Sequence, residues 1–600
     1  MRPAVPPFAA TLAPLLVSLA LPAQQPLRWL DLEGDTARQT TVHRVARKYQ
    51  GHPTTVLLAD GKTMLCVHPE GHGKGPIVLQ RSDDAGVTWS GPQAVPENWA
   101  TSQETPTIHR LTAPGADSER LVLFSGLFPI RSSVSADGGR TWTPLQPIGD
   151  FGGIVAMASV VALANGEHAA YFHDDGRFFR SADGKRAQFT VYQTLSNDGG
   201  ATWQAPTVVT TSLDLDLCEP GVVRSPDGKR LAMLLRENSR QHPAQILFSD
   251  DESRTWSAPR AMPSSLCGDR HVGAWAPDGR LLVSFRDMAP DSPTRGDWVA
   301  WVGTFDDLVV GRDGQYRVRL ARNWRGTDCG YPGVEVLADG TFVLVTYGHW
   351  EPGDAPFVRA VRLRLAELDE LAKGAPPKFV REPGTVRPTA RIEEWWPKRV
   401  ADDLAAARAG GHRVVFVGDS ITQGWNKNGA EPWQDTWEGR HTLNLGVSGD
   451  KTQHVLWRLE HGQLEALAAE NNDVRAVVVM IGTNNSNGDE CTAEEIAAGI
   501  EAIVRAVRKA LPKSKVLLLS IFPRSEKPDA LRAKCATASE LASKAFAGDD
   551  HVVCRDLGKH FVEADGSIKK EVMPDFLHLA PPAYRTWSEA MLADVESMLR

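Results

Sequence analysis

The chain has 600 residues, more than one hydrophobic core usually organises, so its length predicts two or more domains. With 42% hydrophobic and 23% charged residues, the composition is ordinary for a soluble globular protein. The formal net charge of -8 is modest and no block rich in lysine and arginine stands out, so we expect no nucleic-acid partner.

The first 23 residues have the pattern of an export signal. Arg2 is followed by an apolar, uncharged run that closes on small residues near Ala20 or Ala23. The alternative is an uncleaved membrane anchor, but the prolines and the short apolar core of this run argue against a stable span. We therefore expect a signal peptide over residues 1–23, an exported protein (periplasmic or extracellular) and no stable membrane insertion.

The cysteines give no sign of a disulfide scaffold or a zinc site. There are seven of them, they are scattered, and no two form a C-x-x-C pair. Neither half of the chain shows a metal motif, so we expect no cofactor, although a structural cation in the first half stays open.

The first half of the chain repeats itself. The pattern S-x-D-x-G-x-T-W begins at Ser82, Ser135 and Ser196, and again at Ser249 with Ser253 in place of the glycine. The copies lie about 50 to 60 residues apart, and Asp-Gly pairs flanked by apolar runs between them predict β-hairpins. A period of this length with several short strands predicts a β-propeller over residues 28–373.

These repeats are Asp boxes, and with them the first half resembles the sialidase (neuraminidase) superfamily, a six-bladed propeller. By this resemblance, "CEPGVVRSPDGKRLAMLLREN" supplies a catalytic Glu219 and a substrate-binding Arg236. "DCGYPGVEVLADGTFVLVTYG" supplies a tyrosine nucleophile, Tyr331, and "SPTRGDWVAWVGTFDD" supplies a further arginine of a carboxylate clamp, Arg295. A glutamate beside a tyrosine is chemically sensible, because the carboxylate can take the phenol proton.

Two departures from the sialidase pattern weaken the expected activity. His52 stands where the family has the arginine that completes the clamp, and two guanidinium groups hold a carboxylate less well than three. The loop "HPEGHGKGP" lacks the acid/base aspartate, and Glu70, His68 and His72 are its candidate substitutes. Sialoside hydrolysis, action on a different glycan and simple glycan binding therefore all remain open, and Glu219 and Tyr331 could also be a buried structural pair.

The second half changes its period. Residues 374–397 are rich in proline and predict a linker. From residue 398 to 600, short apolar strands alternate with amphipathic helices, which predicts a parallel sheet covered on both faces, a three-layer, flavodoxin-like α/β sandwich. In such sheets the ligand site lies beyond the carboxyl ends of the strands.

The strand ends of this half carry a nucleophile, two oxyanion donors and a base with its carboxylate. In chain order these are Ser420, Gly449, Asn484, Asp575 and His578. The set resembles the SGNH (GDSL-type) hydrolases, and within them the catalytic subunits of platelet-activating-factor acetylhydrolase. The motif around Ser420 is not the G-x-S-x-G elbow of the α/β-hydrolases, so a different fold is implied.

The SGNH resemblance implies that His578, oriented by Asp575, takes the proton of Ser420 as the serine attacks an ester carbonyl. The backbone N–H groups of Ser420 and Gly449 and the amide of Asn484 would meet the oxyanion. We expect an exported carbohydrate-active serine esterase whose propeller binds or hydrolyses the glycan. A lipid or phospholipid acetylhydrolase and an exo-α-sialidase are the alternatives. The acyl group, the sugar, the oligomeric state and the cysteine pairing stay open.

Overall fold

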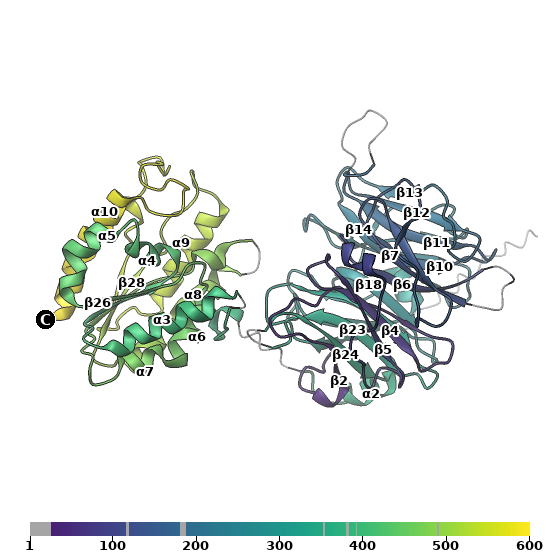
Figure 1. Ribbon diagram of the computed structural model, residues 1–600, viewed down its shortest axis with the longest axis horizontal. Helices are drawn as coiled ribbons and strands as arrows, with labels where there is room; N and C mark the ends of the chain where they lie inside the picture. Colours follow the sequence, from purple (N-terminus) through teal and green to yellow (C-terminus); the bar gives the residue numbers. More distant parts are fainter. Residues whose placement is uncertain are drawn as a thin grey trace, which may run out of the picture.

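The computed structural model describes residues 26–113, 115, 119–179, 188–351, 354–377, 379, 383–391, 393–488 and 491–600. The predicted signal peptide lies outside these residues. The described chain forms two bodies, a β-propeller and an α/β domain, joined by the segment that follows residue 373 (Figure 1).

The propeller has six blades among the described residues, each a small twisted sheet, and this confirms the predicted fold. The first strands of neighbouring blades contact one another all the way round the ring, from β3 through β6, β10, β14, β18 and β22 back to β3. The blades, in order, are β3 (Thr54–Leu57), β4 (Met64–Pro69) and β5 (Ile77–Ser82); β6 (Thr107–Thr112), β7 (Glu119–Ser125), β8 (Arg131–Ser135) and β9 (Gln146–Pro147); β10 (Ile154–Ala162), β11 (His168–Asp174), β12 (Thr190–Ser196) and β13 (Thr207–Thr211); β14 (Leu217–Arg224), β15 (Leu231–Glu237), β16 (Gln245–Ser249) and β17 (Arg260–Ala261); β18 (Gly268–Trp275), β19 (Leu281–Asp287), β20 (Trp298–Gly303) and β21 (Tyr316–Ala321); and β22 (Cys329–Val336), β23 (Phe342–Gly348) and β24 (Phe357–Leu363).

Two strands from the start of the described chain complete the last two blades. β1 (Arg28–Asp31) pairs parallel with β21, and β2 (Gln39–His43) pairs antiparallel with β24. Because blades five and six thus contain strands from both ends of the propeller sequence, the ring is held closed by backbone hydrogen bonds. Two short helices belong to these blades: α1 (Phe305–Val310) follows β20, and α2 (Leu365–Leu371) follows β24.

The repeated S-x-D-x-G-x-T-W motif forms a self-bonded corner. In the first copy the Ser82 hydroxyl donates to Asp84 at 2.8 Å and accepts the N–H of Gly86 at 2.8 Å, while Thr88 N–H donates to Asp84 at 2.9 Å. Glycine suits the fifth position of the motif, occupied here by Gly86, because φ there is +78°. Ser253 adopts the same left-handed region in the fourth copy, with φ of +66°.

The second body is a three-layer α/β domain built on a five-stranded parallel sheet in the order β26-β25-β27-β28-β29, as predicted (Figure 1). Alternate residues of a strand point to opposite faces, so Val415 and Val417 pack under α3, α6, α7, α8 and α9, whereas Val414 and Phe416 pack under α4 and α10. The strands are β25 (Val414–Gly418), β26 (Thr442–Gly446), β27 (Ala476–Met480), β28 (Lys515–Leu519) and β29 (Val552–Arg555); the helices are α3 (Trp395–Ala409), α4 (Ser420–Gln423), α5 (Ala430–Pro432), α6 (Thr452–Arg458), α7 (Leu464–Leu467), α8 (Ala493–Ala510), α9 (Ala530–Lys544) and α10 (Pro581–Leu599).

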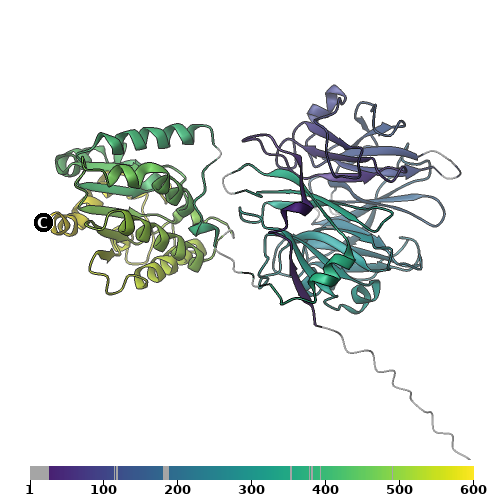
Figure 2. The same cartoon turned by 90° about the horizontal axis from the view of Figure 1, so that it is seen from below.

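The proline-rich segment runs between the two bodies (Figure 2) and contacts both of them. On the α/β side, Thr452 donates its hydroxyl proton to the carbonyl of Thr385 at 3.0 Å, and Thr389 N–H donates to the carbonyl of Gln453 at 3.0 Å. On the propeller side, the guanidinium of Arg387 lies 3.2 Å from the ring centroid of Trp324. Helical structure also begins at Trp395, earlier than the boundary of 398 expected from composition.

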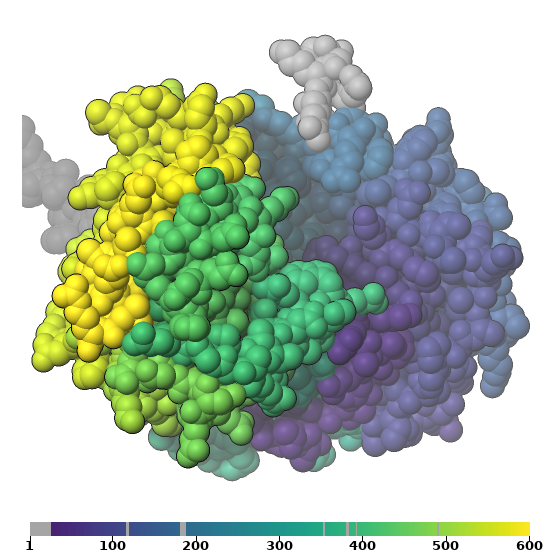
Figure 3. Space-filling view, turned by 60° about the vertical axis from the view of Figure 1, so that its left-hand side comes forward, coloured from purple at the N-terminus to yellow at the C-terminus, as the bar shows by residue number. Residues whose placement is uncertain are grey.

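In the view of Figure 3 the α/β domain, green and yellow, stands in front of the blue and purple propeller. The seven cysteines all lie in the described part of the chain and none forms a disulfide. Among the described helices, none combines the length and the apolar character that a membrane crossing requires.

Candidate active site

Ser420 lies at the carboxyl end of the central strand β25, where the chain turns into α4. Gly418 ends the strand, and a Cβ there would lie 2.1 Å from the Thr422 hydroxyl and 2.5 Å from the Met480 carbonyl, so only glycine fits. Asp419 caps the helix by accepting the N–H of Ile421 at 3.0 Å. Ser420 is therefore the first residue of α4, where backbone N–H groups are unpaired and can meet negative charge.

The structure brings Ser420, His578 and Asp575 together in one relay. His578 Nε2 lies 2.9 Å from Ser420 Oγ, and His578 Nδ1 lies 2.7 Å from Asp575 Oδ2. Asp575 also accepts the backbone N–H groups of Leu577 at 3.1 Å and His578 at 2.7 Å. Although partial burial favours the neutral acid, the hydrogen bonds from His578 lower the pKa of Asp575. An ionised Asp575 keeps the imidazole proton on Nδ1, which leaves Nε2 to accept the proton of Ser420.

Gly449 and Asn484 follow the two strands that flank β25. Gly418 is in register with Gly446 of β26 and with Met480 of β27, so the loops that carry the three motifs leave the same edge of the sheet. Gly449 has φ of +75°, a region that favours glycine. Asn484 Nδ2 donates one hydrogen bond to the carbonyl of Asp450 at 2.9 Å, and its second N–H is left for another acceptor.

A buried ion pair joins the Ser420 turn to the Gly449 loop. Arg458 and Asp450 are both fully buried and bond at 2.8 Å, and Arg458 also donates to the carbonyl of Gly418 at 3.0 Å. Trp396 Nε1 donates to the other carboxylate oxygen of Asp450 at 2.9 Å. Breaking such a pair would leave a buried charge uncompensated, so this network fixes the relative positions of the two loops.

Arg391, from the segment before α3, supports the Gly449 loop from outside. Its Nη1 donates to the carbonyl of Ser448 at 2.6 Å and lies 3.4 Å from Asp450 Oδ1. Glu393 holds the same guanidinium through a 2.6 Å ion pair. A Cβ on Gly449 would lie 3.0 Å from Arg391, so the guanidinium packs directly against the loop.

A second polar group gathers at the centre of the propeller, where Tyr331 donates to Glu219 Oε1 at 2.6 Å. Arg236 donates to the same oxygen at 2.7 Å. Both strands that carry the pair are bulged, with register shifts in β14 and β22, and φ is +53° at Glu219 and +62° at Tyr331. Left-handed backbone at non-glycine residues is costly and concentrates at functional sites. The predicted pair thus comes together.

Three arginines of this group are paired with a carboxylate of the protein itself. Asp269 is 1% exposed and bonds to Arg240 at 2.6 and 2.7 Å, to Arg286 at 2.9 Å and to Arg236 at 3.5 Å. Although burial disfavours its charge, Arg286 and Arg236 hold the pKa of Asp269 well below its usual range.

Arg295, predicted from the resemblance to belong to a carboxylate clamp, is not part of the arginine group around Asp269. Arg295 lies in the loop between β19 and β20, where its N–H closes a turn onto the carbonyl of Ser292 at 3.2 Å. It contributes none of the ion pairs around Asp269, and Arg286 of β19 does so instead. Arg286 lies in a strand of the blade, whereas Arg295 lies in the loop that follows it.

His52 lies beside Tyr331, with ring centroids 4.4 Å apart, but it does not replace a clamp arginine. Its Nδ1 accepts the N–H of Gly73 at 3.1 Å and its Nε2 lies 3.2 Å from the hydroxyl of Tyr347. Burial also keeps the pKa of His52 well below its usual value. The ring is therefore neutral, and both of its nitrogens already have partners.

The three candidate acid/base substitutes have different surroundings. His68 is fully buried against His43, with 3.0 Å between ring nitrogens, and burial lowers its pKa to about 3. Glu70 lies 3.9 Å from Lys48. His72 is exposed and its ring centroid lies 4.7 Å from that of His52, so of the three it comes nearest to the group around Tyr331.

Sequence reasoning missed two residues of the propeller group. The charge of Glu104 contributes to raising the pKa of Tyr331, so this second carboxyl lies close to the phenol. Arg270 lies with its guanidinium 6.0 Å from the ring centroid of Tyr331. The signal for both was positional: Glu104 precedes the first strand of its blade, and Arg270 lies in the first strand of the next blade after Glu219.

The comparisons with known proteins agree with this division into two bodies. A model described as GDSL-like Lipase/Acylhydrolase family matches residues 416–586. The platelet-activating factor acetylhydrolase IB subunit alpha1 of Rattus norvegicus is 41% identical over 171 residues, which cover 28% of this chain and 69% of that protein. The chain belongs to the GDSL-like lipase/acylhydrolase family.

Further similarities cover both halves. The alpha2 subunit from Homo sapiens is 42% identical over 171 residues, covering 28% of this chain and 70% of the relative. A model described as BNR repeat-like domain matches residues 23–212 and 125–288. A sialidase structure from Trypanosoma rangeli aligns at 14% identity with a TM-score of 0.37, over 55% of this chain and 56% of that one. The family models and the sheet topology together show a BNR repeat-like propeller joined to a GDSL-like domain.

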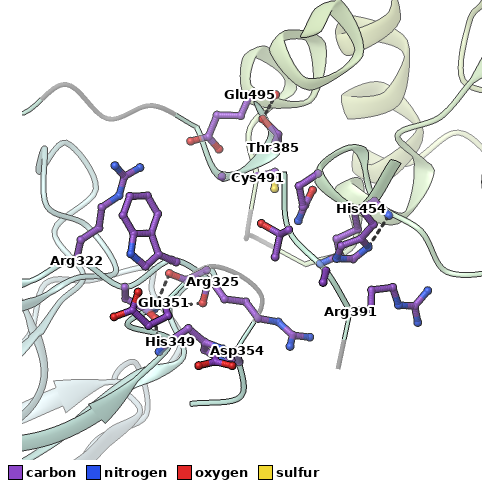
Figure 4. Close-up of a pocket in the computed structure, with 18 of the residues that line it drawn as sticks. Arg322, Arg325, His349, Glu351, Asp354, Thr385, Arg391, His454, Cys491 and Glu495 are labelled. Carbon is purple, nitrogen blue, oxygen red and sulfur yellow. Dashed lines mark hydrogen bonds between the residues drawn. The ribbon is translucent and has the colours of Figure 1, made fainter. Parts of the chain in front are cut away.

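A small cavity of about 100 Å³ lies between the propeller and the GDSL domain (Figure 4). Arg325 and Glu351 from the propeller, Arg391 from the connecting segment and His454 from the GDSL domain are among its lining residues. Burial and then the neighbouring Arg391 lower the pKa of His454, so its ring is neutral. Neither Ser420 nor Tyr331 lines this cavity. It is therefore a polar cavity separate from both the Ser420 site and the Tyr331 group.

Proposed function

We propose that the protein is an exported, carbohydrate-active serine esterase that removes short acyl groups, such as O-acetyl, from a glycan bound by its propeller. The observation that carries the proposal is the Ser420–His578–Asp575 relay, with 2.9 and 2.7 Å between successive partners. It lies beside two further oxyanion donors at the carboxyl ends of the flanking strands. This constellation suits nucleophilic attack on a carbonyl carbon.

In the proposed reaction Ser420 Oγ forms a bond to the ester carbonyl carbon while its proton passes to His578 Nε2. The backbone N–H groups of Ser420 and Gly449 and the free N–H of Asn484 stabilise the oxyanion. The alcohol then leaves with the proton from His578, and a water molecule deprotonated by the same imidazole releases the acid. An oxyanion donor of this kind lowers the activation free energy by on the order of 3 kcal/mol.

The propeller supports a glycan as the acylated substrate, because its Glu219–Tyr331 group resembles a sugar site. Binding without hydrolysis is favoured, since Arg240 and Arg286 already pair with Asp269 and His52 is neutral and bonded. The second candidate function, glycoside hydrolysis, is supported by the 2.6 Å bond from Tyr331 to Glu219, which would activate the phenol. Export is proposed from the sequence of the first 23 residues.

The relatives named as platelet-activating factor acetylhydrolase subunits supply the third alternative, a lipid acetylhydrolase. A single panel of assays separates the three. Purified wild type, Ser420→Ala and Tyr331→Phe are tested on p-nitrophenyl acetate, acetylated xylan, an acetylated phospholipid and a 4-methylumbelliferyl sialoside. We expect Ser420→Ala to lose ester hydrolysis on the first two substrates, by at least about a thousandfold, while Tyr331→Phe keeps it.

The outcomes of this panel are distinct. Wild-type ester hydrolysis in Ser420→Ala contradicts the esterase proposal. Turnover of the phospholipid but not of the polysaccharide supports the lipid alternative, and sialoside turnover that Tyr331→Phe abolishes supports glycoside hydrolysis. Thermal unfolding of each variant checks that the fold is kept.

A further inference from the structure

Arg270 is a buried cation at the centre of the propeller, and two of its three guanidinium nitrogens lack a hydrogen-bond partner among the described residues. It is 2% exposed, and neither its Nε nor its Nη1 has a hydrogen-bond partner in the described part of the chain. A buried guanidinium without its hydrogen bonds is strongly destabilising, so a fold that keeps one has a use for it. Ion-paired arginines elsewhere in the group show that the fold can satisfy such groups.

The backbone directs Arg270 to the propeller axis. It occupies a bulge in β18, the first strand of its blade, with φ of +54°. Glu219, Tyr331 and His52 have φ of +53°, +62° and +54° at the corresponding places in, or just before, the first strands of their blades. Repeated use of a costly conformation at one level of the ring indicates a shared purpose for the side chains that it aims inward.

The surroundings of Arg270 come from several blades. Its guanidinium lies 6.0 Å from the Tyr331 ring centroid, and its charge interacts with Glu219 in one neighbouring blade and with His109 across the ring. Glu219 Oε2 is likewise buried and has no hydrogen-bond partner among the described residues. Unsatisfied donors and an unsatisfied acceptor therefore face the same space.

This pairing of donors with an acceptor distinguishes two kinds of sugar. A carboxylate needs donors only, and the arginines that could form such a clamp are already bonded to Asp269. Neighbouring hydroxyl groups of an uncharged sugar both accept and donate, so they match a guanidinium beside a carboxylate.

We propose that the axis of the propeller binds an uncharged, hydroxyl-rich sugar residue, with Arg270 donating to one hydroxyl and Glu219 Oε2 accepting from its neighbour. The inference rests on the proposed glycan-binding role of the propeller and specifies the sugar class. It assigns to Arg270 the recognition role that the sequence suggested for Arg295 and His52.

The test is calorimetric binding by the full chain in the Ser420→Ala background, so that no ester is consumed. The probes are xylotetraose, cellotetraose, mannotetraose, lactose and 3'-sialyllactose. We expect at least one uncharged probe to bind, sialyllactose to bind no more tightly than lactose, and Arg270→Met to weaken binding at least tenfold. Arg295→Gln is the matched control and should bind as the parent does.

Stability distinguishes recognition from a structural role. Because Arg270→Met removes a buried guanidinium with two nitrogens that lack hydrogen bonds, we expect an unchanged or higher Tm together with the lost binding, and Arg270→Lys to restore part of the binding. The proposal is overturned if no uncharged probe binds, if sialyllactose binds more than tenfold more tightly than lactose, or if Arg270→Met binds normally. Ester hydrolysis by Ser420 is measured separately, so its failure would be recognised as a failure of the esterase proposal.

Discussion

The Ser420 site and the propeller group differ in how the chain assembles them. In the GDSL domain Ser420, Gly449 and Asn484 follow the ends of three neighbouring parallel strands, and Asp575 and His578 come from the segment before α10. In the propeller the side chains converge from bulges in several blades, and the partner of each arginine depends on packing between blades. Strand-end motifs therefore carry their geometry in the sequence, whereas an axial site in a ring does not.

The largest change in kcat that would test this comparison is expected from a substitution of Asn484. Asn484→Ala removes the side-chain oxyanion donor and should lower kcat for p-nitrophenyl acetate by roughly 100- to 1,000-fold, with little change in KM. The affinity of the propeller for glycan should not change. Steady-state kinetics measure the first quantity and calorimetry the second. A kcat within threefold of wild type would show that Asn484 does not meet the oxyanion.

A smaller effect is expected at Arg391, which acts through the Gly449 loop. Arg391→Met removes the 2.6 Å bond to the Ser448 carbonyl, so the Gly449 N–H should be less well placed and kcat should fall about tenfold at constant KM. Arg387→Met is the matched control, because it removes an equal charge from the same segment, where the guanidinium stacks on Trp324. Equal losses in the two variants would contradict a role in positioning the loop.

The last expected effect is on stability and not on kcat, and it concerns Asp419. Burial raises the pKa of Asp419 from 3.8 to about 7. The folded state thus holds a proton that the unfolded state releases between these values, so stability should fall as pH rises from about 4 to about 7 and then level off. The slope from this one group is at most about 1.4 kcal/mol per pH unit.

Asp419→Asn keeps a side-chain oxygen that can accept the N–H of Ile421, but the amide side chain cannot ionise. Its denaturation profile, followed for the unfolding step of the GDSL domain from pH 4 to 8, should therefore be flatter than that of the wild type. Parallel profiles for the two proteins would show that Asp419 is not the source of the pH dependence.

The sequence predicted the two folds and the convergence of Ser420, His578 and Asp575 because each depends on local patterns. Hairpin turns at regular spacing specify blades, and alternating strands and helices place Ser420 and Asn484 at one edge of the sheet. It did not indicate Arg286, since a loop arginine and a strand arginine nine residues apart look alike until the blades pack. Arg270 could not be foreseen, because its importance comes from a bulge that changes the direction of the side chain.

The support that Arg391 gives to the Gly449 loop could not be predicted from the sequence either. Arg391 lies in a stretch rich in proline, where composition predicts only a connection between domains. Its contact with Ser448 joins residues 57 positions apart and depends on how the segment runs across the α/β domain. Contacts of this kind follow from tertiary packing, which periodicity does not describe.

The most direct measurement of the central claim, that ester chemistry belongs to Ser420 and not to the propeller, is labelling with a fluorophosphonate. The reagent forms a covalent bond to an activated serine, and peptide mass spectrometry locates it. We predict one adduct per chain, on the peptide that contains Ser420, and none in the Ser420→Ala protein. An adduct on a propeller residue, or ester hydrolysis that persists while Ser420 stays unlabelled, would contradict the account.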